Sequence, residues 1–153
     1  APPKDFHFFK RSFLRLETDI PVEYRYMKAE QQDLIPVSVV HKGALNDISP
    51  CGALLSIDKK ELLFSPKDPS LYMNLKFSLP GVTGNQTLEI TGKTVNLKKS
   101  WNNYYLGILF LINTFQQYRI LENFYKDTLA ELEIDQKESQ DIQQHLKNVL
   151  AIY

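Results

Sequence analysis

The stretch from residue 71 to residue 80 alternates apolar and polar side chains without interruption. Its apolar members are Leu71, Met73, Leu75, Phe77 and Leu79. Because successive side chains of a β-strand point to opposite faces, this period of two predicts a strand with one buried face. Such a strand is stable only when other strands bury their apolar faces against the same core, so we expect a sheet protein.

Five further segments have strand signals. β-Branched and aromatic residues predict strands at residues 19–27, 34–45, 52–57, 87–97 and 104–112. Residues 30–33 predict a polar turn, and residues 98–103 predict a hairpin connection. Six short strands without helical segments between them predict a mainly β fold, an antiparallel barrel or sandwich. Closure into a barrel would remove exposed sheet edges.

The sequence period becomes helical after residue 113. Thr114 and Gln117 have the spacing of a capping box. One face of the predicted helix is apolar, at Phe115, Tyr118, Leu121, Tyr125, Leu129 and Leu132. Asp135 and Glu138 are interpreted as the start of another helix. We expect this tail to pack either on its own barrel or on another subunit.

Length and charge limit the classes of function. A chain of 153 residues with 43% hydrophobic and 24% charged residues is long enough for one folded domain with appendages. The 18 acidic and 18 basic residues cancel, which does not favour binding of long nucleic acids or of a membrane surface. The longest strongly apolar run, residues 104–112, is about half of what a membrane-spanning helix needs. The chain begins Ala-Pro-Pro, which indicates a trimmed chain or the end of a longer protein.

The single cysteine, Cys51, excludes an internal disulfide and a cysteine-rich zinc site. A reducing, cytoplasmic location fits it best. His7, His41 and His145 have no metal-ligand spacing, so no metal is expected. A hydrolase that pairs Cys51 with His41 is a weak alternative, because nothing in the sequence indicates an activated thiol. No catalytic residues are predicted.

The segment from residue 46 to residue 57 combines a turn with a strand. Asp47 and Ser49 place a carboxylate and a hydroxyl two residues apart, where each can bond turn backbone or a ligand. Gly52 permits a positive φ or a close approach of another group. Alone, this pattern is an ordinary turn followed by a glycine.

A second motif lies upstream, in residues 1–18, which we interpret as an N-terminal arm. Arg11 and Arg15 are four residues apart, and each guanidinium is a planar fork suited to phosphate oxygens or to the N7 and O6 edge of guanine. Pro2 and Pro3 favour an extended backbone. Phenylalanines interleaved with the cations are expected to anchor the arm on the barrel.

In this order, R-x-x-x-R followed by D-x-S-x-x-G resembles the signature of PilZ domains, over about residues 10–125. The resemblance implies a six-stranded antiparallel PilZ-type β-barrel at residues 19–113 with a C-terminal helical extension, of one or more helices, at residues 114–153. It also implies that the chain binds cyclic di-GMP and is not an enzyme. The implied ligand-binding residues are Arg11, Arg15, Asp47, Ser49 and Gly52, and Lys10 adds charge that could help to hold a second nucleotide.

The resemblance assigns a role to each residue. Arg11 and Arg15 would stack on a base, bind N7 and O6, or pair with phosphate. Asp47 would accept hydrogen bonds from guanine N1 and N2, Ser49 would bond the phosphodiester or nearby backbone, and Gly52 would leave room. We expect no cofactor apart from this ligand, and we expect ligand binding to order the arm and change contacts with an unidentified protein partner or an additional domain.

Two alternatives belong to other functional classes. One is an interaction domain that keeps the barrel, binds nucleotide weakly or not at all, and works or oligomerises through its helical tail. The other is a barrel that binds single-stranded nucleic acid, suggested by Trp101, Tyr104, Tyr105, Lys98 and Lys99. Such a binder needs a basic groove with stacking platforms, and the zero net charge argues against nucleic acid as a partner.

Overall fold

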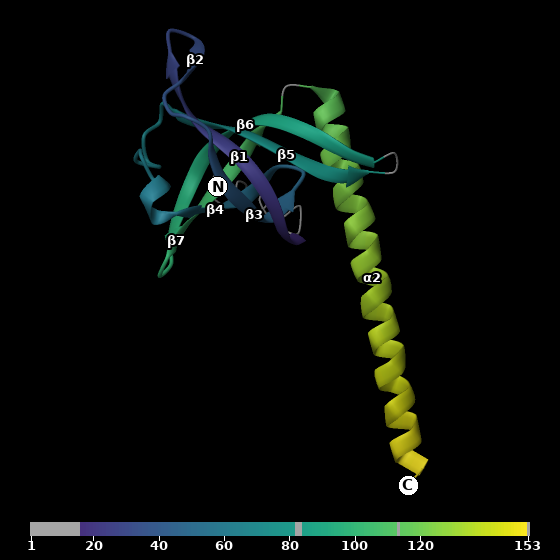
Figure 1. Ribbon diagram of the computed structural model, residues 1–153. Helices are drawn as coiled ribbons and strands as arrows, with labels where there is room; N and C mark the ends of the chain where they lie inside the picture. Colours follow the sequence, from purple (N-terminus) through teal and green to yellow (C-terminus); the bar gives the residue numbers. More distant parts are fainter. Residues whose placement is uncertain (1–15, 82–83, 113, 153) are drawn as a thin grey trace, which may run out of the picture.

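The computed structural model describes residues 16–81, 84–112 and 114–152. Figure 1 shows a small barrel with one long helix against its side. In chain order the elements are β1 Leu16–Glu30, β2 Asp33–Pro36, β3 His41–Ser49, β4 Gly52–Asp58, the 3₁₀ helix η1 Lys59–Glu61, β5 Leu71–Gly81, β6 Gly84–Lys99, β7 Asn103–Leu111 and α2 Phe115–Ile152.

Six of the strands close into an antiparallel barrel. Their order is β1-β3-β4-β7-β6-β5, and β5 pairs back onto β1 through Val22–Lys28. The predicted six-stranded barrel is therefore confirmed. The short strand β2 lies outside it and pairs with the last residues of β1 as a hairpin, which projects from the barrel in Figure 1.

The inward-facing side chains of the six strands fill the barrel. In β5 every apolar member of the alternating stretch is buried, and Tyr72 and Asn74 between them are half-buried on the outer face. Burial of a leucine-sized side chain stabilises the fold by about 1.5–3 kcal/mol. The strand predicted from this alternation, with one buried face, is confirmed.

The prediction of one strand at residues 34–45 was wrong, because β2 and β3 are separate strands. Pro36 has no N–H group to continue a ladder, and the Ser38 hydroxyl accepts a hydrogen bond from the Tyr26 N–H at 2.9 Å. Val39 is 72% exposed between the two strands. Valines that resemble a strand in composition thus occupy a connection.

β1 begins at Leu16, earlier than the predicted start at residue 19. The register shifts between Glu17 and Ile20, and the Thr18 hydroxyl donates to the Leu45 carbonyl at 2.8 Å. A bulge breaks the period of two, which explains why alternation alone placed the start of the strand too late.

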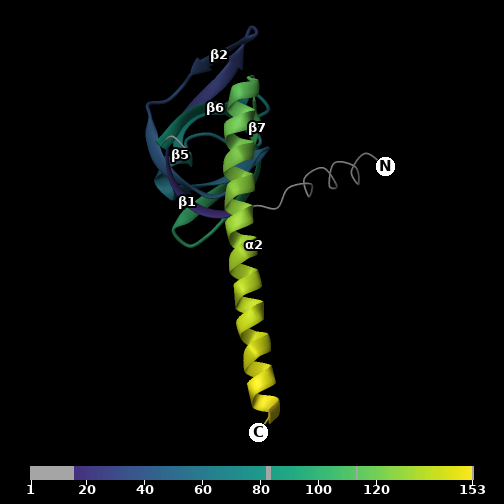
Figure 2. The same cartoon turned by 90° about the vertical axis from the view of Figure 1, so that its right-hand side faces the viewer.

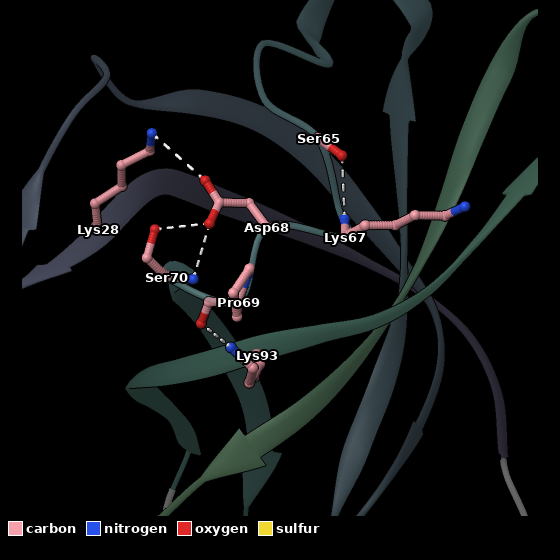
Figure 3. A network of polar contacts seen from close by, with 7 residues as sticks. All are labelled: Lys28, Ser65, Lys67, Asp68, Pro69, Ser70 and Lys93. Carbon is pink, nitrogen blue, oxygen red and sulfur yellow. Dashed lines mark hydrogen bonds and ion pairs between the residues drawn. The ribbon is translucent and has the colours of Figure 1, made fainter.

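The connection between η1 and β5 is fixed by the polar contacts in Figure 3. Asp68 accepts hydrogen bonds from the N–H and hydroxyl of Ser70, at 2.9 and 2.8 Å, and lies 3.5 Å from the ammonium group of Lys28 on β1. Lys93 on β6 donates to the Pro69 carbonyl at 2.6 Å. The hydrogen bonds from Ser70 hold the pKa of the Asp68 carboxyl below its usual value. The loop is therefore held to two strands of the barrel, β1 and β6.

A single helix, α2, replaces the two helices that the sequence suggested. The Thr114 hydroxyl accepts from the Gln117 N–H at 3.3 Å, but the Gln117 amide donates to the Glu89 carbonyl at 2.8 Å and does not complete a capping box. Leu121 and Tyr125 are buried against the barrel. The helix then continues well past the barrel in both views (Figures 1 and 2). No described helix is long and apolar enough to cross a membrane.

An aromatic cluster closes one end of the barrel. The Tyr24 ring stacks on His41 at a centroid distance of 5.4 Å, and the Tyr26 hydroxyl donates to the Glu61 carbonyl at 2.6 Å. His41 also forms an ion pair with the Glu61 carboxylate. Burial raises the pKa of the Tyr24 phenol above its usual value and raises the pKa of Tyr26 to about 12.

We expect the free energy of unfolding to fall less steeply with rising pH in the Tyr24→Phe variant than in the parent chain at alkaline pH. Above pH 10 the unfolded chain releases phenolic protons that the folded chain retains, so the free energy of unfolding falls by about 1.4 kcal/mol per pH unit for each buried tyrosine. At pH 7 the substitution should change the free energy of unfolding little, because the buried Tyr24 hydroxyl has no hydrogen-bond partner among the described residues. Urea unfolding between pH 7 and 12 measures both effects, with Tyr72→Phe on the outer face as the control. An unchanged alkaline slope in Tyr24→Phe would contradict this assignment.

Candidate ligand-binding site

The β3–β4 hairpin contains the whole D-x-S-x-x-G motif. Ser49 pairs with Gly52 across a two-residue turn. The Ser49 hydroxyl accepts from the Cys51 N–H at 3.3 Å and donates to the Gly52 carbonyl at 3.5 Å, and only 8% of Ser49 is exposed. This hydroxyl therefore stabilises the turn itself, which corresponds to the backbone-bonding role predicted for it.

Gly52 lies where two strands approach closely. A Cβ atom at this position would be 2.2 Å from the Ile108 carbonyl oxygen on β7. The Cys51 carbonyl accepts from the Phe110 N–H at 2.8 Å, which holds the same turn against β7. The barrel alone therefore requires a glycine here, whatever the ligand requires.

Asp47 lies directly opposite Glu17 of β1. Their neighbours Leu16 and Ile48 are also partners and are both buried, so Glu17 and Asp47 lie on the outer face. Like charges directly opposite each other on paired strands are unfavourable, and a cation between them relieves the repulsion. Sequence reasoning missed Glu17, because bulges in both strands set this register.

Apolar residues of the next two strands continue the same outer surface. Leu54 on β4 pairs with Asp47, and Leu109 on β7 pairs with Gly52 and is 40% exposed. These side chains place apolar surface beside a carboxylate. Sequence reasoning missed this surface too, because it depends on the pairing of β4 with β7.

The start of β1 determines where the arm joins the barrel. Leu16 is the Cα partner of Ile48, which lies between Asp47 and Ser49 in β3. Lys10, Arg11 and Arg15 lie outside the described residues. Arg15 is nevertheless bonded directly to Leu16, at the edge of the motif turn.

A concavity of about 620 Å³ lies on the outer face of the same strands. Lys42 and Gly43 of β3 line it, together with Lys76 of β5 and residues of β1 and β6. Asp47, Ser49 and Gly52 are not among its lining residues. Its two lysines lie on different strands, Lys42 on β3 and Lys76 on β5, and both are Cα partners of Glu23 on β1. Only Lys42 therefore belongs to a strand that bears the motif.

Catalytic pairing of Cys51 with His41 is excluded by geometry. His41 begins β3 and Cys51 lies in the turn after its last residue, Ser49, so the nine residues of the strand separate the two by about 25 Å. Desolvation also raises the pKa of the Cys51 thiol, so the thiol is not activated. Within the described parts of the chain, no three His, Cys, Asp or Glu residues are grouped so that they could hold a metal ion.

No family model matches the sequence, and no curated protein matches it significantly. Solved structures do match the fold. The inhibitor of motility MotI/DgrA from Bacillus subtilis has a TM-score of 0.61 and 11% identity, with 79% of this chain and 52% of that chain covered. MrkH from K. pneumonia in its apo state has a TM-score of 0.54 and 19% identity, with 82% and 53% covered. This chain thus spans about half the length of each.

A third match consists of the barrel domain alone. The PilZ domain of YcgR from Escherichia coli, solved with c-di-GMP, has a TM-score of 0.50 and 13% identity, with 86% of this chain and 98% of that chain covered. At such low identities these matches establish a common fold.

Proposed function

We propose that this chain, whose fold is that of PilZ domains, is a cyclic di-GMP receptor and not an enzyme. The observation that carries the proposal is the β1–β3 register, which pairs Leu16 with Ile48 inside the motif turn. The arm that bears R-x-x-x-R therefore joins the barrel beside D-x-S-x-x-G. The two motifs are about thirty residues apart in sequence, and the register brings Leu16, the residue that follows the first motif, beside the second.

The covalent chain limits how far the arginines can be from the turn. Arg15 adjoins Leu16, and Arg11 is five residues before it, so the backbone of Arg11 lies within about 18 Å of the start of β1. Cyclic di-GMP has two phosphates and two guanines, and it would bring the guanidinium forks to the outer face beside Asp47. Asp47 and Glu17, which are partners across β3 and β1, place two acidic residues at this end of the ladder.

The barrel supplies complementary contacts. The Asp47 carboxylate would accept from guanine N1 and N2, while Leu54 and Leu109 would lie against the flat face of a base. Charge-assisted hydrogen bonds of about 1.5–3 kcal/mol each make a micromolar dissociation constant, about −8 kcal/mol, attainable. Ordering of the arm works against this, by about 1–2 kcal/mol per fixed residue. Lys10 would add charge for a second nucleotide.

Titration calorimetry tests the proposal. We expect binding of cyclic di-GMP and much weaker binding of GTP or a short oligonucleotide. A folded protein that binds none of the three would contradict the receptor and favour the interaction domain. The length of α2 beyond the barrel supports that second candidate.

Among the motif residues, Asp47→Ala should weaken binding more than Ser49→Ala. Loss of the carboxylate leaves guanine N–H donors unpaired, which costs about 1–3 kcal/mol, a five- to 150-fold loss of affinity. The Ser49 hydroxyl is already bonded to the turn, so Ser49→Ala should mainly lower the melting temperature. Asp58→Ala, an exposed aspartate at the far end of β4, is the matched control. Normal binding by a folded Asp47→Ala variant would contradict the role assigned to this residue.

Ligand binding should order the arm and so produce the signal. The barrel side of the site belongs to paired strands, so most of the change should come from the residues before Leu16. Amide hydrogen exchange with and without cyclic di-GMP should show increased protection before residue 17 and at residues 47–52, and little change at residues 71–79. An arm that is equally protected without ligand would contradict this mechanism but not the receptor. We propose that the ordered arm then contacts a protein partner or an additional domain in the cytoplasm.

A further inference from the structure

The net charge of the chain is zero, but basic residues gather at one end of the barrel, which we call the basic tip. The basic tip consists of Lys98, Lys99 and Trp101 of the β6–β7 hairpin together with Lys59 and Lys60 of η1. The pairing of Asp58 with Asn103, and of Lys99 with Tyr104, brings the two segments together. In Figure 1 this end of β6 and β7 lies on the side of the barrel away from α2. Acidic residues, in contrast, outnumber basic ones in the sequence of α2.

Trp101 is the most exposed aromatic residue at this end of the barrel. Its side chain is 87% exposed. The hairpin beneath it is regular, since the Ser100 N–H donates to the Asn103 carbonyl at 2.9 Å. A large ring held in water at the end of a paired hairpin contributes nothing to the core, so it is available to contact another surface.

The four lysines keep their charges available. All four are exposed, and none forms an ion pair with a described residue. The nearest acids have other partners, because Asp58 caps η1 through the Lys60 N–H at 3.1 Å and Glu61 pairs with His41. Lys28 and Lys93, in contrast, are bonded to the loop shown in Figure 3.

We propose that the basic tip docks the protein on an anionic phospholipid surface. Tryptophan favours the membrane–water interface, where its ring lies at the level of the headgroups. Lysines around it can extend their ammonium groups to lipid phosphates while their stems follow the apolar surface. Each lysine near an anionic leaflet should raise the affinity of the protein for that leaflet about fivefold.

Single-stranded nucleic acid fits the basic tip less well. Successive bases need several open aromatic faces, and only Trp101 provides one. Tyr104 packs against the core beneath the Lys59 ammonium, which lies 5.9 Å from its ring centroid, and Tyr105 is half-buried in the ladder. The aromatic residues that suggested a nucleic-acid barrel are therefore partly used by the fold.

The basic tip is separate from the proposed nucleotide site. Gly52 pairs with Leu109 at one end of the β4–β7 ladder, and Asp58 pairs with Asn103 at the other. The seven residues of β4 span about 20 Å. Docking on lipid therefore does not depend on cyclic di-GMP binding, and either can fail without the other.

Because Trp101 is the only tryptophan of the chain, its fluorescence reports directly on the basic tip. Vesicles of phosphatidylcholine with about 30 mol% phosphatidylserine, which give an anionic surface, are added to the full chain in low salt. We expect the emission to shift to shorter wavelength and the protein to sediment with the vesicles. Pure phosphatidylcholine vesicles should give neither result. Absence of both with the anionic vesicles would overturn the proposal.

Variants separate lipid docking from general charge attraction. Lys98→Gln with Lys99→Gln should weaken vesicle binding by about 25-fold, at about fivefold per lysine. Lys76→Gln, an exposed lysine on β5, is the matched control and should bind normally. Trp101→Ser should reduce cosedimentation while circular dichroism is unchanged. Equal losses from Lys76→Gln, or quenching by an oligonucleotide without any response to vesicles, would overturn lipid docking.

Discussion

Arg11→Ala and Arg15→Ala are each expected to weaken cyclic di-GMP binding by about 10- to 100-fold, and the double variant should show no measurable binding. In the proposed complex, each guanidinium would make charge-assisted bonds of about 1.5–3 kcal/mol to a phosphate or a guanine edge. Thermal stability should change little, because both residues precede the first strand of the barrel. Titration calorimetry and thermal melts on the same preparations measure the two effects.

Lysine variants at the same positions test the geometry of the contact. Arg11→Lys and Arg15→Lys keep the charge but lose the planar fork, so they should also bind poorly. Lys4→Ala is the control, since it removes a cation from the same arm but lies outside the R-x-x-x-R motif. Wild-type affinity in both alanine variants would refute the receptor assignment.

Gly52→Ala should lower the free energy of unfolding by about 3 kcal/mol or more, at the upper end for overpacking. The new Cβ would be 2.2 Å from the Ile108 carbonyl oxygen, a backbone atom that cannot move without disturbing the β4–β7 ladder. Urea unfolding measures the loss.

Gly84→Ala is the matched control for this change. Gly84 has a φ of 115° but no atom within 4 Å of a Cβ position, so its substitution should cost about 1–2 kcal/mol from conformation alone. Equal stability of Gly52→Ala and the parent chain would contradict the close approach of β4 and β7. Because substitution of Gly52 also destabilises the fold, any loss of ligand affinity in a Gly52 variant must be corrected for the fraction of the protein that is folded.

Local patterns predicted most of the barrel. The alternation in β5 marks one buried face, and the turn at residues 30–33 is where β1 meets β2. The predicted strand bounds were wrong where side-chain hydrogen bonds or bulges interrupt the regular ladder. Pro36 and Ser38 end β2 within a valine-rich segment, and the shift after Glu17 conceals the start of β1.

The candidate site was only partly predictable. Spacing identifies Asp47, Ser49 and Gly52, because they belong to one hairpin. It does not identify Glu17 or Leu109. Glu17 lies opposite Asp47 because of a bulge in β1, and Leu109 lies opposite Gly52 because β4 pairs with the distant strand β7. The same limit applies to the basic tip, where η1 joins the hairpin only after β4 and β7 pair.

The pairing of β4 with β7 also determines when the surface around Gly52 can form. The ribosome makes Gly52 well before Leu109, which pairs with it near the end of the last strand. Barrels closed by such distant pairings fold slowly, because loop-closure entropy opposes each contact. Between these two points the nascent chain carries both motifs without the paired surface on which the proposed ligand, cyclic di-GMP, would assemble them. A ligand of this site would stabilise the finished barrel by mass action, but it could not template an unfinished one.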